Sequence, residues 1–94
     1  MKVRWTLPAA NQLQEIFEYI ALDSPDAARR TIERIRAAIR NASTRPYAGR
    51  SGRVPGTREL VVSGTPYLVA YKIDGELLHV LCIRHGAREW PATF

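Results

Sequence analysis

Residues 67–85 read YLVAYKIDGELLHVLCIRH, and this stretch decides the fold of the chain. It consists of two runs rich in β-branched, aromatic and other apolar residues, separated by Asp74-Gly75. An Asp-Gly pair favours the two-residue turn of a β-hairpin, because glycine accepts the positive φ that such a turn requires. We therefore expect Tyr67 to Ile73 and Glu76 to His85 to form two antiparallel strands.

Both alternating sets of residues in this hairpin are largely apolar. A sheet with helices on one face only normally has polar residues on the other, so we expect the second face to be covered. Three covers are compatible with the sequence. They are a central position of the strands in the core, the C-terminal tail folding back with Trp90 and Phe94, and a partner chain.

The segments just before the hairpin predict one more strand and a loop. Ser63-Gly-Thr-Pro66 has the composition of a turn, and Arg58 to Ser63 has that of a strand, which completes a three-stranded antiparallel meander. Tyr47 to Gly56 contains three glycines and a proline. We expect that stretch to be an irregular loop.

The first half of the chain predicts a short strand followed by two helices. Val3 and Trp5 alternate with charged residues over residues 2–6, as in a strand. Thr6 and Ser24 are suitable N-caps, each with a proline in the first turn that follows. The apolar residues then recur at helical spacing: Ala10, Leu13, Ile16, Phe17 and Ile20 in the first helix, and Ala28, Ile32, Ile35, Ile39 and Ala42 in the second.

Together these elements predict one α+β domain spanning residues 1–94. It comprises a short N-terminal strand, an antiparallel two-helix hairpin and a three-stranded antiparallel meander, with the helices on one face of the sheet. No apolar run approaches the roughly 18 residues of a membrane span, and no signal-peptide pattern follows Met1. The single cysteine, Cys82, excludes an internal disulfide. These features predict a cytoplasmic protein with no membrane partner.

Arginine dominates the charge of the chain. Fourteen Lys and Arg residues against nine Asp and Glu give a net charge of +5, and twelve of the fourteen are arginine. Residues 45–60 contain Arg45, Arg50, Arg53 and Arg58 against Glu59 alone. Because a guanidinium binds phosphates and carboxylates at two points, we expect this stretch to bind a polyanion or an acidic protein segment. The alternative is that the basic surface only keeps the protein in solution.

The order and spacing of these pieces resemble the RelE/ParE superfamily of toxins from bacterial type II toxin–antitoxin systems. The resemblance covers nearly the whole chain. It rests on Trp5 with Ala9 and Leu13, Ile16 to Ile20 with Ser24 to Ala28, Pro46 to Arg50, Val54 to Leu60, Pro66 to Tyr71, and Ile83 to Trp90. It implies a toxin neutralised by an acidic antitoxin encoded beside it. RelE-like members cleave mRNA on the ribosome, whereas ParE-like members inhibit DNA gyrase without being nucleases.

The resemblance also implies candidate site residues for a metal-independent endoribonuclease, which needs a base, an acid and cations around the phosphate. The candidates are Arg58, His85 and Arg84 for catalysis, and Arg50, Arg53 and Arg88 for flanking phosphates. Arg58 matches the family position that contacts the scissile phosphate in nuclease members, although it could instead pair with Glu59 or with an antitoxin carboxylate. A histidine such as His85 exchanges protons near neutral pH, but some gyrase-directed relatives also have one there.

The remaining polar residues predict no further site. Glu59 could be a general base, but in a strand it points away from Arg58. His79 lies within an apolar strand and is expected to be a buried core or interface histidine. Two histidines and one cysteine do not have zinc-site spacing, so we expect neither a metal nor a cofactor. The sequence favours mRNA cleavage, with gyrase inhibition as the alternative because the arginine-rich loop lacks lysine.

Overall fold

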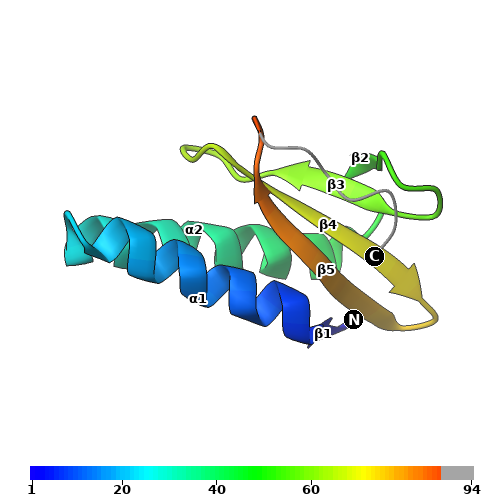
Figure 1. Cartoon of the computed structure of the whole chain (residues 1–94). Helices are drawn as coiled ribbons and strands as arrows, with labels where there is room; N and C mark the ends of the chain where they lie inside the picture. Colours follow the sequence, from blue (N-terminus) through cyan, green and yellow to red (C-terminus); the bar gives the residue numbers. More distant parts are fainter. Residues whose placement is uncertain (88–94) are drawn as a thin grey trace.

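The computed structural model describes residues 1–87 and has two layers (Figure 1). Two helices, α1 (Leu7–Ala21) and α2 (Pro25–Thr44), lie on one face of a five-stranded sheet. The strands are β1 (Lys2–Trp5), β2 (Arg50–Ser51), β3 (Arg58–Val61), β4 (Tyr67–Asp74) and β5 (Leu77–His85), in the spatial order β1-β5-β4-β3-β2. The predicted α+β class, with helices on one face, is confirmed.

Both helices begin where their capping residues predict. The Thr6 hydroxyl accepts a hydrogen bond from the Ala9 N–H at 3.4 Å, and the Ser24 hydroxyl accepts one from the Ala27 N–H at 3.1 Å. Each cap satisfies one of the N–H groups that the first turn leaves without an intrahelical partner. Neither helix in residues 1–87 is long and apolar enough to cross a membrane.

The predicted meander is formed by β3, β4 and β5, which are antiparallel neighbours. A β-bulge interrupts the pairing of β4 with β5, because Ala70 lies opposite Cys82 whereas Tyr71 lies opposite Val80. The extra residue changes which alternate side chains of β5 face the helices. Val80 therefore reaches the helix-covered core before the bulge, and Ile83 reaches it after the bulge. This shift explains part of the apolar character of both alternating sets in β5.

The other face of the sheet is also buried at its centre, as the apolar pattern predicts. Leu68, Ala70 and Cys82 have 7%, 1% and 1% of their surfaces exposed. Trp90 and Phe94, the tail residues considered as one cover, lie outside the described residues, as does Arg88.

Two features of the sheet differ from the sequence prediction. The N-terminal strand β1 pairs in parallel with β5, so β5 lies inside the sheet. The loop over residues 47–56 is not irregular throughout, because Arg50–Ser51 forms β2, antiparallel to Arg58 and Glu59. Glycines at positions 49 and 52 flank these two residues without preventing an extended backbone between them.

Candidate functional site: the arginine loop and its surroundings

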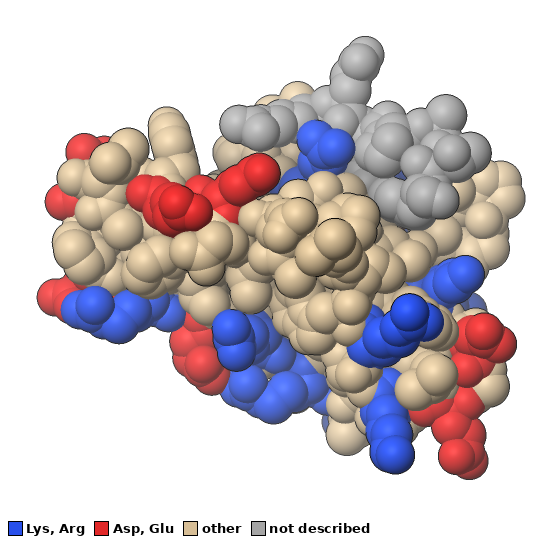
Figure 2. Space-filling view, turned by 60° about the horizontal axis from the view of Figure 1, so that its bottom comes forward, with Lys and Arg blue, Asp and Glu red and all other residues tan. Residues whose placement is uncertain are grey.

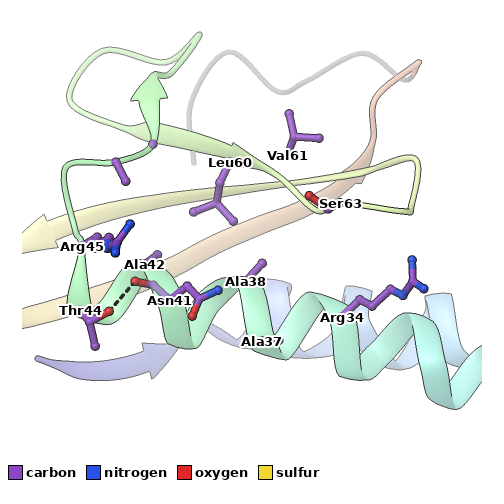
Figure 3. A pocket seen from close by; sticks show the side chains of 12 residues that line it. Arg34, Ala37, Ala38, Asn41, Ala42, Thr44, Arg45, Leu60, Val61 and Ser63 are labelled. Atoms are coloured by element: carbon purple, nitrogen blue, oxygen red, sulfur yellow. Dashed lines mark hydrogen bonds between the residues drawn. The ribbon is translucent and has the colours of Figure 1, made fainter.

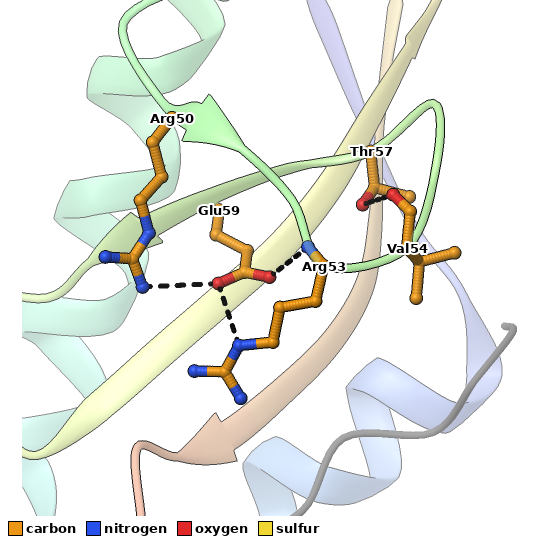
Figure 4. Close-up of polar contacts among 5 residues, drawn as sticks. All are labelled: Arg50, Arg53, Val54, Thr57 and Glu59. Carbon is orange, nitrogen blue, oxygen red and sulfur yellow. Dashed lines mark hydrogen bonds and ion pairs between the residues drawn. The ribbon is translucent and has the colours of Figure 1, made fainter.

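Glu59 is the centre of an arginine cluster between β2 and β3 (Figure 4). The strand register places Arg50 directly opposite Glu59. Nη2 of Arg50 donates to Oε1 of Glu59 at 3.3 Å, and Nε of Arg53 lies 3.7 Å from the same oxygen. The backbone N–H of Arg53 donates to Oε2 at 2.8 Å. One carboxylate thus contacts two guanidinium groups and the backbone of the loop that joins the strands.

The members of this cluster differ sharply in exposure. The Glu59 side chain is 2% exposed, whereas the side chains of Arg50 and Arg53 are 58% and 46% exposed. A buried carboxylate normally requires charged or hydrogen-bonding partners, which Glu59 has on both oxygens. The structure thus brings together Arg50 and Arg53, two of the candidates for flanking phosphates, on the carboxylate of Glu59, and it leaves their side chains partly exposed.

Arg58 lies on the opposite face of β3, because neighbouring residues in a strand alternate. Its Nη1 donates to the backbone carbonyls of Tyr47 at 3.2 Å and Gly49 at 2.8 Å. Its guanidinium also stacks over the Tyr47 ring, 4.8 Å from the centroid, in a cation–π arrangement. Arg58 therefore fixes the segment that leads from α2 into β2, and Glu59 points away from it as predicted.

The hydroxyl of the buried Tyr71 contacts the same segment. It donates to the Pro46 carbonyl at 2.8 Å and accepts the Gly49 N–H at 3.2 Å. A side chain at position 49 would collide with this hydroxyl, so only glycine fits there. Sequence analysis placed Tyr71 in a strand but missed this role, although a tyrosine in a buried strand needs a hydrogen-bond partner for its hydroxyl.

His85 and Arg84 lie apart from Arg58. His85 is opposite Tyr67, with the ring centroids 5.8 Å apart, and its Nδ1 accepts the Ala87 N–H at 3.2 Å. Arg84 is on the other face, and its buried Nε has no hydrogen-bond partner within residues 1–87. The register places Arg58 two strands away and four residues along from His85. At the usual strand dimensions, their backbones are roughly 16 Å apart.

A groove between α2 and β3 forms a second surface feature (Figure 3). Its floor contains Ala37, Ala38 and Leu60, and arginines at positions 34 and 45 line it as well. Because β2 pairs only with Arg58 and Glu59, no strand within residues 1–87 pairs with the Leu60–Val61 part of β3 on this side. The Val61 side chain is 60% exposed. The groove thus combines apolar contacts, a free strand edge and cations.

The two helices carry opposite charge. Helix α1 contains Glu15 and Glu18 but no Lys or Arg, whereas α2 contains five arginines against Asp26 and Glu33. Figure 2 shows basic side chains following the lower border of the view and a group of acidic side chains near its upper left. Arg29 pairs with Asp26, and Arg40 pairs with Glu33 at 2.7 Å. The basic helix and the arginine loop follow each other in the chain.

Comparison with known proteins decides the family. A family described as "ParE toxin of type II toxin-antitoxin system, parDE" matches residues 3–90. The chain belongs to the ParE toxin family. It is 41% identical over 90 residues to the protein Y4kP of Sinorhizobium fredii, covering 96% of this chain and 93% of that one. It is 38% identical over 87 residues to toxin RelE2 of Caulobacter vibrioides, covering 93% and 97% of the two chains.

The fold of this ParE-family chain agrees with a solved relative. A chain from the chromosomal ParDE system of P. aeruginosa is 27% identical, with a TM-score of 0.80 over 90% of this chain and 95% of that chain. The protein is therefore a RelE/ParE superfamily toxin of a type II toxin–antitoxin system, and an antitoxin is its partner. Within residues 1–87 of this toxin, no three His, Cys, Asp or Glu side chains are grouped as metal ligands.

Proposed function

We propose that this ParE-family toxin arrests growth by binding DNA gyrase and does not cleave mRNA. The separation of Arg58 from His85 carries this proposal. A general acid or base must come within about 3 Å of the proton that it transfers. Arg58 lies against Tyr47 and the Gly49 carbonyl, and His85 lies against Tyr67 roughly 16 Å away by the strand spacing.

The partly exposed arginines of the loop suit protein binding. Arg50 and Arg53 present partly exposed guanidinium groups on a braced loop. The groove beside α2 adds apolar surface next to them in the chain. Interfaces are enriched in arginine and apolar residues, whereas acid–base cleavage needs groups that converge on one phosphate. We infer further that the antitoxin is the acidic product of an adjacent reading frame, and that both proteins act in the cytoplasm.

A supercoiling assay tests the gyrase proposal. Relaxed plasmid is incubated with gyrase, ATP and increasing amounts of purified toxin, and the topoisomers are resolved on a gel. We expect supercoiling to fall with toxin concentration and to recover when the antitoxin is added. Undiminished supercoiling at a large molar excess of toxin would contradict the proposal.

Primer extension on cellular mRNA after a short induction tests the competing activity. We expect transcripts to stay intact in cells whose growth has stopped. Discrete new 5′ ends that disappear in the His85→Gln variant would instead establish mRNA cleavage, and Arg58, Arg84 and His85 would then be the residues to examine. His85→Gln keeps a polar side chain of similar size at the end of β5, so loss of folding does not obscure the comparison.

A further inference from the structure

We propose that Glu59 is a positioning residue: its buried carboxylate holds the loop between β2 and β3 so that Arg50 and Arg53 bind an acidic protein segment. The proposal rests on the proposed function only in that the ligand is a protein. It assigns a role to an acidic residue inside a basic stretch of the chain. Charge alone would predict that such a residue weakens the binding of an acidic partner.

Glu59 contacts both arginines of the pair. Its Oε1 is 3.3 Å from Arg50 Nη2 and 3.7 Å from Arg53 Nε, so the two guanidinium groups converge on one oxygen. Its Oε2 accepts the Arg53 backbone N–H at 2.8 Å, which also fixes the main chain that carries this side chain. The carboxylate therefore sets the distance between the two cations as well as the path of the loop.

The rest of the loop closes on itself. The Gly52 N–H donates to the Thr57 carbonyl at 2.8 Å, and the Thr57 hydroxyl donates to the Val54 carbonyl at 2.6 Å. A side chain at position 52 would collide with Thr57, so the turn depends on glycine there. This small closed loop is tied to the sheet through Glu59, whose carboxylate contacts Arg50 of β2 and Arg53 at the start of the loop (Figure 4).

The composition of the loop favours a protein ligand over RNA. Residues 50–57 read RSGRVPGT and contain no aromatic side chain. Proteins that bind single-stranded nucleic acid usually stack bases on aromatic rings. Tyr47, an exposed ring in the segment before β2, stacks with Arg58, whose strand register places it on the opposite face from Glu59. An arginine fork fits a carboxylate at two points, which suits aspartate and glutamate side chains of a partner.

A preformed pair of cations binds more tightly than two mobile ones, because less conformational freedom is lost on binding. Removing the Glu59 charge has two opposing effects. It raises the net charge of the loop by one, which strengthens attraction to an acidic ligand. It also releases Arg50, Arg53 and the loop backbone. We expect the release of the arginines and the loop to outweigh the gain in attraction, so the affinity for the acidic ligand should fall. A positioning role thus predicts weaker binding, whereas charge alone predicts tighter binding.

The test uses the full-length toxin and fluorescein-labelled poly-L-glutamate, with binding followed by fluorescence anisotropy. The variant is Glu59→Gln, which keeps the size of the side chain and removes its charge. The matched control is Glu76→Gln, which removes the same charge from an exposed position in the β4–β5 turn. We expect Glu59→Gln to weaken binding about tenfold and Glu76→Gln to leave it unchanged or slightly tighter.

A second variant protects the test against loss of folding. Thr57→Val has the same shape and charge as the native residue at that position but lacks the hydroxyl that closes the loop on Val54. We expect it to weaken binding as well, with an unchanged circular dichroism spectrum. If Glu59→Gln fails to fold, Thr57→Val decides alone: weaker binding supports the proposal, and unchanged binding overturns it.

Three further results would overturn the proposal. If Glu59→Gln binds poly-L-glutamate more tightly than the native toxin does, Glu59 acts only as a negative charge that opposes binding. If the unaltered toxin does not bind poly-L-glutamate, the ligand is not an acidic protein segment. If the toxin prefers labelled poly(U) to poly-L-glutamate, the ligand is RNA and not protein. None of these results depends on the supercoiling assay, so the proposed function and this inference fail separately.

Discussion

The hydroxyl of Tyr71 is the residue-scale feature with the clearest energetic consequence. The side chain is 0% exposed, and its hydroxyl bonds both the Pro46 carbonyl and the Gly49 N–H. In Tyr71→Phe these two backbone groups lose their partner in a buried place, so we expect the free energy of unfolding to fall by about 1–3 kcal/mol. Urea denaturation followed by circular dichroism measures the change.

Tyr19→Phe is the control for that prediction, because the Tyr19 side chain is 74% exposed. We expect its unfolding free energy to stay within about 0.5 kcal/mol of the native value. Equal losses for the two variants would show that the Tyr71 hydrogen bonds contribute nothing specific.

Individual residues also show where sequence reasoning stops. Charge density alone predicted a basic loop that contains Arg50 and Arg53, because charge density depends on composition over a few positions. The orientation of Arg58 and Glu59 on opposite faces followed from strand alternation. The partners of those side chains did not follow, because they depend on the pairing of β2 with β3. The bulge between β4 and β5 is likewise invisible to a strict alternation rule.

At the scale of whole elements, the two N-cap side chains differ in the elements that they bond. Within residues 1–87, the Ser24 hydroxyl bonds only the Ala27 N–H of its own helix. Thr6 caps α1 and also donates to the Val80 carbonyl of β5 at 2.8 Å. We expect Ser24→Ala to cost about 1 kcal/mol of unfolding free energy and Thr6→Ala to cost more, by about another 1 kcal/mol.

Chemical denaturation of the two alanine variants ranks the caps directly. Ser24→Thr and Thr6→Ser are the matched controls, since each retains a capping hydroxyl, and both should stay close to the native stability. A larger loss for Ser24→Ala than for Thr6→Ala would show that the contact with β5 adds little.

Elements with local signals could be predicted, and those defined by distant contacts could not. Caps, helical spacing and the Asp74-Gly75 turn lie within a few residues of the structure they specify, and the helices and the hairpin formed as expected. The parallel pairing of β1 with β5 joins residues about 75 positions apart, for example Lys2 with Leu77. No local pattern encodes such a pairing, and β2 is too short to show alternation.

Across the whole molecule, the uneven charge predicts how the toxin meets its antitoxin. The net charge is +5, and α2 and the arginine loop contribute most of the excess. Surface charges separated by more than the Debye length, about 10 Å at 0.1 M salt, are largely screened. We therefore expect the association rate with the acidic antitoxin to fall about tenfold or more from low to high salt, with a smaller change in the dissociation rate.

Stopped-flow mixing of toxin and antitoxin over a series of NaCl concentrations measures both rates. The double variant Arg30→Gln/Arg36→Gln removes two exposed charges from α2 and should reduce the salt dependence while keeping the fold. An association rate that does not change with salt would show that charge does not guide the encounter.

The interior position of β5 has a consequence for folding during translation. The sheet places β5, near the C-terminal end of the described chain, between β1 at the beginning and β4. During translation, the helices and the first strands leave the ribosome before the strand that joins them to one another. A nascent chain that stops before residue 77 has no partner for β1 and leaves one backbone edge of β4 unpaired. We therefore expect the sheet to form only after β5 has been synthesised, and a chain that terminates before β5 to lack the fold of the toxin.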